Sequence, residues 1–194
     1  MSKMEQKRAE KRHAILTAAE HTFLSQGYLS ASMDAIARLA AVTKQTVYRY
    51  YPSKLALFAA TLAKMGESEE FSFLVHLEEP DNQAALLGFA RHFIRAHLSN
   101  EHLATYRLLV AEHGKAPELI ASFNEQGNDE VGQQLTAFFD QRLRLADANM
   151  MVDLFCGMLL APRSQVLIGM PVPSAAVLEQ LAQSATALIM AQVR

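Results

Sequence analysis

The chain has 194 residues, of which 51% are hydrophobic, and this length and composition suit one large domain or one small and one medium domain. No apolar run reaches the ~18 residues of a membrane-spanning helix, and charged residues occupy the N-terminus where a signal peptide has its apolar region. The single cysteine, Cys156, excludes an intramolecular disulfide and a cysteine-based metal site. We therefore expect a cytoplasmic protein. Cys156 is expected to be a buried apolar side chain, and the alternative role for this cysteine is that of a redox sensor.

The charge is divided unevenly along the chain. Residues 1–64 contain ten Lys and Arg and four Asp and Glu, which gives a formal charge of +6. Since the net charge of the whole chain is −2, residues 65–194 carry −8. A basic end on an acidic body favours a nucleic acid partner at that end. The first basic residues are candidates for contact with a nucleic acid backbone or an adjacent minor groove, the alternative being a solvated helix end: Lys3, Lys7, Arg8, Lys11 and Arg12.

Helical patterns begin near the N-terminus. Apolar residues recur at helical spacing over residues 5–25. Ser32 and Thr43 are good N-cap residues for two short helices joined by a tight turn, and Pro52 ends the second of these. Ser53 then caps a fourth helix. Two short helices with such a turn predict a helix-turn-helix, which places its second helix in the DNA major groove. This pattern favours a DNA-binding regulator over an enzyme.

The segment 46–58, TVYRYYPSKLALF, carries a family resemblance. It resembles the signature of the TetR/AcrR family of bacterial transcriptional regulators at Tyr48, Tyr50, Tyr51, Ser53, Lys54, Leu57 and Phe58. Upstream, Ile36-Ala37 and Ala40-Ala41-Val42-Thr43 resemble the Ile-Ala and Ala-Gly-Val-Ser elements of that family. The resemblance covers residues 10–60. It implies an all-α fold of about nine helices, with a helix-turn-helix domain over 1–52 and a larger ligand-binding and dimerisation domain over 53–194.

Two positions depart from the family pattern. Ala41 stands where glycine is usual in the turn, so the turn is either not left-handed or slightly strained. Tyr51 stands where phenylalanine is usual, and its ring can still pack inward, but its hydroxyl then needs a partner.

The candidate DNA contacts lie in and around the second helix of the motif: Ser32, Thr43, Lys44, Gln45, Thr46, Tyr48, Tyr50 and Lys54. At a helix N-terminus, Thr43 can offer its backbone N–H and hydroxyl to a phosphate. Lys44 and Gln45 are suited to base edges, since Lys can donate to guanine and Gln can pair with adenine. The resemblance implies that Tyr48 and Tyr50 contact phosphate and sugar and that Lys54 holds the DNA backbone. Loss of Lys54 should then lower the salt slope of binding by about one unit.

Helical patterns resume after an acidic, irregular connection over 66–80. They predict helices over 82–98, 101–113, 117–145, 148–161 and 174–193, and no β-alternation is convincing, so the fold is expected to be all-α. The last two helices are apolar over a wide arc and must bury two faces, one within the chain and one against a partner. The resemblance implies a homodimer through 148–161 and 174–193, the alternative being a purely intramolecular core. Two copies would place their reading helices about 34 Å apart on a palindromic site.

The resemblance also implies an effector pocket in the C-terminal body. The candidate lining, each member of which can instead be plain core or surface, is Phe89, Phe93, His97, Tyr106, Leu109, Val110, Phe123, Phe155 and Met158. The possible polar handles of this pocket are His92, His97 and Arg107. Such a lining suits a small apolar or amphipathic effector. The stretch PELIASFNEQG with the pattern over 155–169 resembles the AefR-like branch. No cofactor is expected, and the histidine spacings predict no metal site.

Together these features predict a homodimeric repressor that a small molecule releases from a palindromic operator in double-stranded DNA. The alternatives are a DNA-binding regulator without a small-molecule ligand, an activator, and an enzyme built on the helical body. Residues 53–65 are the only direct covalent route from pocket to reading domain, so we expect this helix to move on effector binding.

Overall fold

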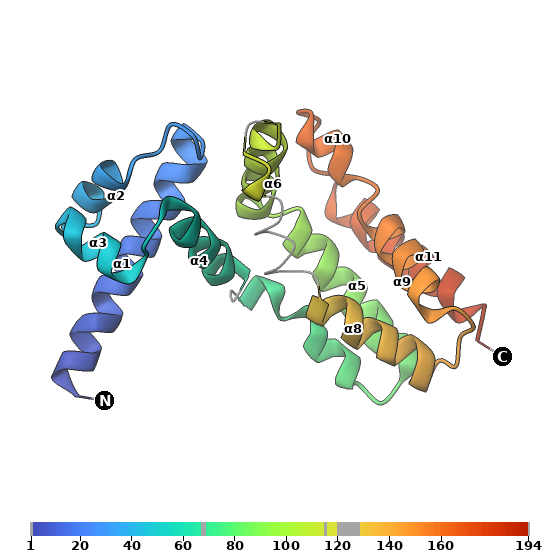
Figure 1. Ribbon diagram of the computed structural model, residues 1–194. Helices are drawn as coiled ribbons and strands as arrows, with labels where there is room; N and C mark the ends of the chain where they lie inside the picture. Colours follow the sequence, from blue (N-terminus) through green and yellow to red (C-terminus); the bar gives the residue numbers. More distant parts are fainter. Residues whose placement is uncertain (1, 67–68, 115, 120–128, 194) are drawn as a thin grey trace. The chain divides into compact units, whose positions relative to one another are not determined.

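The computed structural model describes residues 2–66, 69–114, 116–119 and 129–193. In this part of the chain every regular element is a helix, so the all-α prediction is confirmed (Figure 1). The elements are α1 (Lys3–Gln26), α2 (Met33–Leu39), α3 (Lys44–Tyr50), α4 (Lys54–Gly66), the 3₁₀-helix η1 (Glu69–Glu78), α5 (Asn82–His97), α6 (Asn100–Glu112), α8 (Asp129–Ala137), the π-helical turn η2 (Phe138–Arg142), α9 (Ala148–Leu159), α10 (Arg163–Leu167) and α11 (Ala175–Met190).

The described residues form two compact units. The first contains residues 2–66, 104–114 and 116–119, and the second contains 69–103 and 129–193. The first unit is larger than the predicted domain over 1–52, because α4 and the C-terminal half of α6 bury side chains in the same core as α1. Leu57 and Phe58 of α4 and Leu109 of α6 are almost completely buried there.

The helix starts in the first unit are set by local capping. The hydroxyl oxygens of Ser32, Thr43 and Ser53 accept hydrogen bonds from backbone N–H groups three residues later, at 3.1, 3.2 and 3.0 Å. Gly27 follows the end of α1 with a φ of 82°, and its N–H donates to the Phe23 carbonyl at 3.0 Å. The predicted caps are therefore confirmed, and Gly27 ends α1.

The core of the first unit lies under α1. Ile15, Ala19 and Phe23 face inward from this helix, and their side chains are at most 1% exposed. Phe23 meets Phe58 edge to face at 5.2 Å between ring centroids, and Tyr28 meets Phe58 at 5.3 Å. Because Tyr28 lies in the turn that joins α1 to α2, this aromatic cluster ties that turn to α4.

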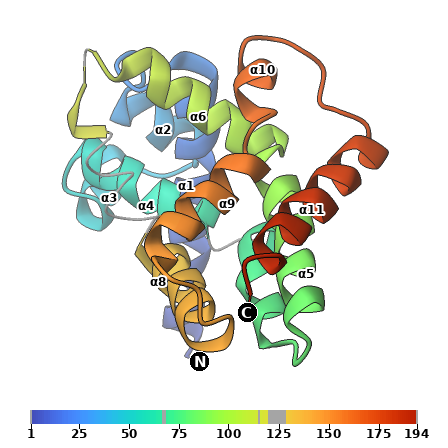
Figure 2. The same cartoon turned by 90° about the vertical axis from the view of Figure 1, so that its right-hand side faces the viewer.

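The second unit is built around α5. Helices α9 and α11 pack against each other and against α5 (Figure 2). The core includes Leu86, Phe89, Leu135, Phe139 and Phe155, which are all fully buried. None of the helices in the described ranges has both the length and the apolar character that crossing a bilayer requires.

The prediction of an irregular connection over 66–80 is wrong for the stretch that forms η1. This helix packs along α5, and Arg142 fixes its end. The Arg142 guanidinium donates to the carbonyl oxygens of Leu77, Glu79 and Pro80 at 2.6, 2.8 and 2.9 Å. Since these partners are backbone atoms far along the chain, no local pattern in the sequence indicates them.

The long helix predicted over 117–145 is found in part. Its described portion is α8 followed by η2, so helical structure runs from Asp129 to Arg142. Residues 120–128 of this prediction lie outside the described part of the chain. The other predicted helices agree with α5, α6, α9 and α11 to within one to three residues at each end.

Candidate DNA-binding surface and effector region

The turn between α2 and α3 adopts the strained alternative. Ala41 has a φ of 52°, in the left-handed region, where its Cβ meets the neighbouring carbonyl. The Val42 N–H donates to the Ala37 carbonyl at 3.0 Å, and the Ala41 N–H donates to the Arg38 carbonyl at 3.1 Å. The turn keeps the tight helix-turn-helix geometry although the residue that suits it best is absent.

One arc of α3 faces solvent. Val47 is fully buried and anchors the helix, whereas Lys44, Gln45 and Tyr48 are exposed around it, with Tyr48 at 42%. Arg49 was not among the predicted DNA contacts. It is exposed one turn after Gln45, and its spacing of four residues from Gln45 indicates that the two side chains share a helix face. Lysine, arginine, glutamine and tyrosine are side chains that contact phosphates and base edges, so this arc can meet DNA.

Lys44 forms an ion pair within its own unit. Its Nζ donates to Asp34 Oδ2 at 2.9 Å, and this hydrogen bond raises the pKa of Lys44. Both side chains are more than half exposed, at 53% and 59%. Exposed ion pairs of this kind are weak, so the pair can open when a stronger partner is offered. In the described part of the chain no ion pair engages the exposed Gln45, so its side chain is the more accessible of the two.

The remaining candidates near α3 serve its cap and flank. The Thr43 hydroxyl accepts from the Thr46 N–H and lies 2.9 Å from the Thr46 hydroxyl. Ser32 caps α2 in the same way, and both Ser32 and Thr43 remain exposed. Tyr50 is half-buried, and the Arg49 guanidinium lies 5.7 Å from its ring centroid. The helix N-termini at Ser32 and Thr43 therefore still present backbone N–H groups to an anion.

Lys54 has partners that the sequence did not indicate. Its Nζ donates to the carbonyl oxygens of Tyr28, Leu29 and Ala31 at 2.8, 3.1 and 3.0 Å, and it lies 4.6 Å from the centroid of the Tyr28 ring. An ammonium has three N–H donors. All of them have partners within the unit in the absence of DNA, and the contact of Lys54 with the DNA backbone stays a prediction.

Several predicted effector residues meet in the second unit. Phe89 stacks on Phe93 at 5.2 Å between ring centroids and lies 6.2 Å from Phe155. Phe73, which belongs to the stretch predicted as irregular, completes the cluster with edge contacts of 5.3 Å to Phe89 and 5.1 Å to Phe93. The half-buried Met158 packs against the same core. This cluster is therefore a packed aromatic core, and a ligand could bind inside it only by displacing side chains.

The other effector candidates lie in the first unit or outside the described residues. Leu109 is buried in the core of the first unit, and Tyr106 is half-buried on the same stretch of α6. Val110 is 58% exposed, so the structure contradicts its place in a buried lining. Phe123 lies outside the described residues. Leu109 and Val110 were chosen from their helical spacing, which does not tell a pocket wall from a core or a surface.

Two histidines are buried beside the aromatic cluster. His97 lies 3.9 Å from Phe93 and 4.6 Å from His102 between ring centroids, and its Nδ1 is 2.8 Å from the Phe93 carbonyl oxygen. Burial lowers the pKa of His97 to about 4 and the pKa of His102 to about 3. Both rings are therefore neutral at pH 7, so this part of the unit offers polar atoms without charge.

The single cysteine behaves as an apolar side chain. Burial raises the pKa of Cys156 to about 12, so its thiol stays protonated and unreactive. This agrees with the predicted buried side chain and disfavours a redox sensor. No group of three or more His, Cys, Asp or Glu side chains in the described ranges is arranged to hold a metal ion.

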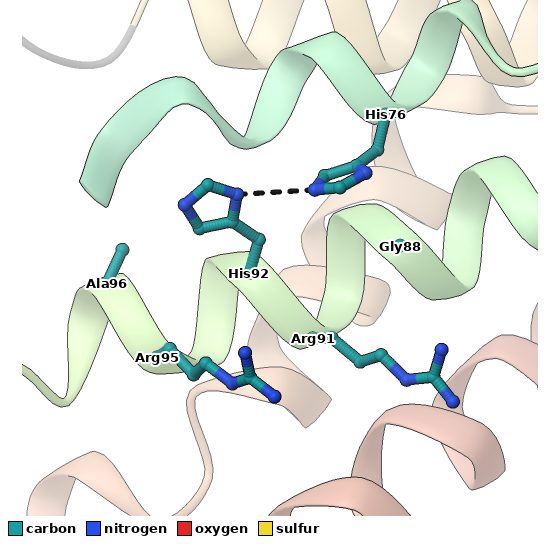
Figure 3. Close-up of a pocket in the computed structure, with 6 residues that line it drawn as sticks. All are labelled: His76, Gly88, Arg91, His92, Arg95 and Ala96. Carbon is teal, nitrogen blue, oxygen red and sulfur yellow. Dashed lines mark hydrogen bonds between the residues drawn. The ribbon is translucent and has the colours of Figure 1, made fainter. Parts of the chain in front are cut away.

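An open groove of about 560 Å³ lies between η1 and α5. Figure 3 shows His76 and His92 facing each other across it, with His76 Nε2 3.2 Å from His92 Nδ1. Arg91 and Arg95 line the same groove, and Arg91 donates through Nε and Nη2 to the Glu179 carboxylate, with the Nε to Oε2 distance at 2.8 Å. Of the residues named for the effector pocket, His92, a possible polar handle, lines this groove, and the apolar residues of that set do not.

The chain is similar to known proteins along most of its length. The family model described as "Bacterial regulatory proteins, tetR family" matches residues 15–61. The model described as "AefR-like transcriptional repressor, C-terminal domain" matches residues 84–192, which is more than half of the chain. The regulator RutR of Escherichia coli K12 is 30% identical over 137 residues, and the match covers 70% of this chain and 59% of RutR. The activator FasR of Mycolicibacterium smegmatis is 42% identical over 57 residues, covering 29% of this chain and 26% of FasR.

Solved structures agree over nearly the full length. A TetR-family transcriptional regulator from Mesorhizobium loti superposes with a TM-score of 0.79 at 25% identity, covering 94% of this chain and 96% of that one. The flavonoid-responsive regulator FrrA superposes with a TM-score of 0.76 at 27% identity and the same coverage. These relatives are transcriptional regulators and not enzymes. The chain therefore belongs to the TetR family of DNA-binding transcriptional regulators and carries an AefR-like C-terminal domain.

Proposed function

We propose that this protein is a homodimeric repressor that binds a palindromic operator in double-stranded DNA and is released by a small apolar or amphipathic effector. The exposed polar arc of α3 is the observation that carries the proposal, because Lys44, Gln45, Tyr48 and Arg49 face outward while Val47 anchors the helix. DNA as the partner implies a cytoplasmic site of action. Curated relatives match over a part of their own length, so the whole-protein activity is part of the proposal.

The groups around α3 divide into two kinds of contact. Gln45 and Lys44 read base edges in the major groove, with Lys44 leaving Asp34 to do so. Thr43, Ser32 and the backbone N–H groups behind them take phosphates, and so do the remaining polar side chains of the arc and flank: Thr46, Tyr48, Arg49 and Tyr50. The first kind gives specificity and the second gives affinity and salt dependence.

Helices α9 and α11 supply the proposed dimer interface. Each buries one face in the core of the second unit, through Phe155 and Leu159 on α9 and through Ala185 and Ile189 on α11. Each also exposes large apolar side chains, which are Met150, Leu154, Val177 and Leu188 at 53–58%. A second copy would cover these side chains, and this is the partner face that the wide apolar arcs predict. The members of the TetR family function as dimers.

The effector class is inferred from the second unit. Its core is rich in phenylalanine, and the buried His97 and His102 are neutral polar groups. FrrA, which superposes over 94% of this chain, is named as flavonoid-responsive. Uncharged, planar aromatic compounds with hydroxyl groups are therefore the first class to test. Such a ligand would act by favouring a conformation whose reading helices no longer fit the groove, with a coupling of about 1–3 kcal/mol.

An activator is the second candidate, and one observation favours it. FasR is named a transcriptional activator, but its similarity is confined to 57 residues. The C-terminal match over residues 84–192 is to a domain described as that of a repressor. Since the C-terminal part decides how DNA binding is controlled, the repressor is preferred.

Selection from a random pool of duplexes tests the proposal. The wild-type protein should enrich palindromic sequences whose half-sites lie about one helical turn, or a multiple of it, apart. The enriched duplex, placed over a reporter promoter, should lower expression, and an active aromatic compound should restore it and raise the melting temperature of the protein. A pool in which no sequence is enriched would show that DNA recognition is wrongly assigned.

A further inference from the structure

We propose that the groove between η1 and α5 binds a small organic acid, whose carboxylate pairs with Arg95 and accepts a hydrogen bond from the His76–His92 pair. This site differs in place and in ligand chemistry from the phenylalanine core proposed above for an uncharged effector, and it does not depend on DNA binding. The groove has a volume of about 560 Å³, which is within the range of small-molecule sites, about 300–1,000 Å³.

The groove follows two adjacent rows of residues on α5. Residues four apart lie above one another on a helix surface. One row is Gly88, His92 and Ala96, and the next is Arg91 and Arg95. His76 of η1 lies over the first row, because a Cβ added at Gly88 would be 2.9 Å from His76 Nδ1. Every polar side chain among the lining residues is therefore a histidine or an arginine, and these come from both elements (Figure 3).

The charges around the groove leave one guanidinium without a carboxylate. Glu179 of α11 accepts from Arg91 Nε at 2.8 Å and from Gln183 Nε2 at 2.7 Å. The hydrogen bond from Arg91 holds the pKa of Glu179 below its ordinary value, so this carboxylate is ionised at pH 7. In the described part of the chain, no ion pair or hydrogen bond engages the exposed Arg95 guanidinium. Arg95 can therefore pair with a carboxylate that a ligand brings.

The histidine pair supplies a hydrogen-bond donor. His76 Nε2 lies 3.2 Å from His92 Nδ1. In a bonded pair of neutral imidazoles one inner nitrogen donates and the other accepts, which leaves one N–H and one lone pair on the two outer nitrogens. Burial and the neighbouring His92 lower the pKa of His76, so its ring is neutral at pH 7. A carboxylate can accept from the outer N–H, and a proton gained by the pair would provide a second donor.

The size of the groove favours an acid with an apolar body over a bare anion. Gly88 and Ala96 leave space along one row of α5, and arginine side chains offer apolar stems below their charged ends. An uncharged ligand would leave Arg95 without a partner, and a phosphate dianion would bring two charges to one available guanidinium. A monocarboxylic acid with a ring or a short chain therefore matches both the charge and the volume.

Binding calorimetry with the full chain, without DNA, tests the proposal. The probes are benzoate, 2-naphthoate and octanoate, each matched by its uncharged carboxamide, together with inorganic phosphate. The variant Arg95→Gln removes the charge that pairs with the acid. The control Arg144→Gln removes an exposed arginine that lies between η2 and α9 and does not line the groove. The ring-proton resonances of His76 and His92 report where the acid binds.

At least one of the acids should bind once per chain and shift both histidine resonances. Arg95→Gln, the matching carboxamide and inorganic phosphate should each weaken binding by about tenfold or more, and Arg144→Gln should stay within about twofold of the wild type. The proposal is overturned if none of the acids binds at millimolar concentration, or if Arg95→Gln binds like the wild type. A carboxamide that binds as tightly as its acid, or phosphate that does so, would equally overturn the assignment of an organic acid.

The contact with the histidine pair predicts a pH dependence. The affinity of the wild type for the acid should rise by at least about threefold from pH 8 to pH 6, because the pair gains a proton and a second donor. His92→Gln should flatten this profile, and a constant affinity in the wild type would overturn the histidine contact. The charged groups around the pair are arginines and carboxylates, which keep their charge over this range: Arg91 and Arg95 on α5, Glu179 on α11, and Glu78 and Glu79 on η1.

Discussion

Tyr51 packs its ring inward and buries its hydroxyl. The side chain is 7% exposed, and within the described ranges its hydroxyl oxygen has no hydrogen-bond partner. A buried polar group without a partner costs about 1–3 kcal/mol. Tyr51→Phe should therefore raise the free energy of unfolding by about 1 kcal/mol in denaturant titrations. Tyr50→Phe is the control and should change it little, because Tyr50 is only half-buried. A loss of stability in Tyr51→Phe would mean that the hydroxyl has a partner.

Single residues also show where reading the sequence succeeds and where it stops. The caps at Ser32, Thr43 and Ser53 were predictable, since a cap depends on a hydroxyl and an N–H three residues later. The partners of Lys54 were not, because backbone carbonyls 23–26 residues away leave no trace in residue types. Arg49 could have been predicted, because it lies four residues after Gln45 on the exposed face of α3.

Among the elements, η1 approaches α5 closely at one glycine. A Cβ added at Gly88 would lie 2.9 Å from His76 Nδ1 and 3.2 Å from His76 Cβ. Gly88→Ala should therefore push η1 away and lower the free energy of unfolding by about 1–3 kcal/mol. Gly132→Ala is the matched control in α8, where an added Cβ meets no atom within 4 Å, and it should stabilise by up to about 1 kcal/mol. Equal effects of the two substitutions would contradict the close approach.

The pair of buried histidines on α5 and α6 predicts a pH dependence. Burial holds the pKa of His97 at about 4 and that of His102 at about 3, below the ordinary 6.5, so the unfolded chain binds protons that the folded chain does not. Stability should thus fall as the pH is lowered from about 6.5 towards 4. Denaturant midpoints across this range should fall less steeply in His102→Gln. The exposed His21→Gln should keep the wild-type profile, and an unchanged profile in His102→Gln would contradict the assignment.

Helical periodicity predicted most elements because amphipathic stripes are local features. Helical periodicity did not predict η1, whose end is held by hydrogen bonds from Arg142 and which packs closely against α5 at Gly88. It also could not separate a pocket wall from a core, and Leu109 and Val110 were therefore placed together although one is buried and the other exposed. The candidate DNA surface was easier to group from the sequence than the effector region, since its residues lie within one short stretch of chain.

At the scale of the whole molecule, assembly should depend on the exposed faces of α9 and α11. Leu188→Glu places a charge on an apolar side chain that is 58% exposed, so the fold should tolerate it while a dimer would not. Sedimentation velocity should show a monomer for Leu188→Glu, and its affinity for the enriched duplex should fall. Val75→Glu, on η1 with an exposure of 57%, is the control and should remain a dimer. A dimeric Leu188→Glu would place the interface elsewhere.

The central claim is that α3 reads DNA sequence, and Gln45→Ala tests it most directly. Gln45 is exposed on the reading arc and makes no cap or core contact that the fold requires, so the variant should fold normally. Duplexes selected by Gln45→Ala should differ from those selected by the wild type at one position in each half-site, with preference there relaxed by about 1–3 kcal/mol. If Gln45→Ala weakened all sequences equally and enriched the same duplexes as the wild type, α3 would not read bases through this residue and the account would be contradicted.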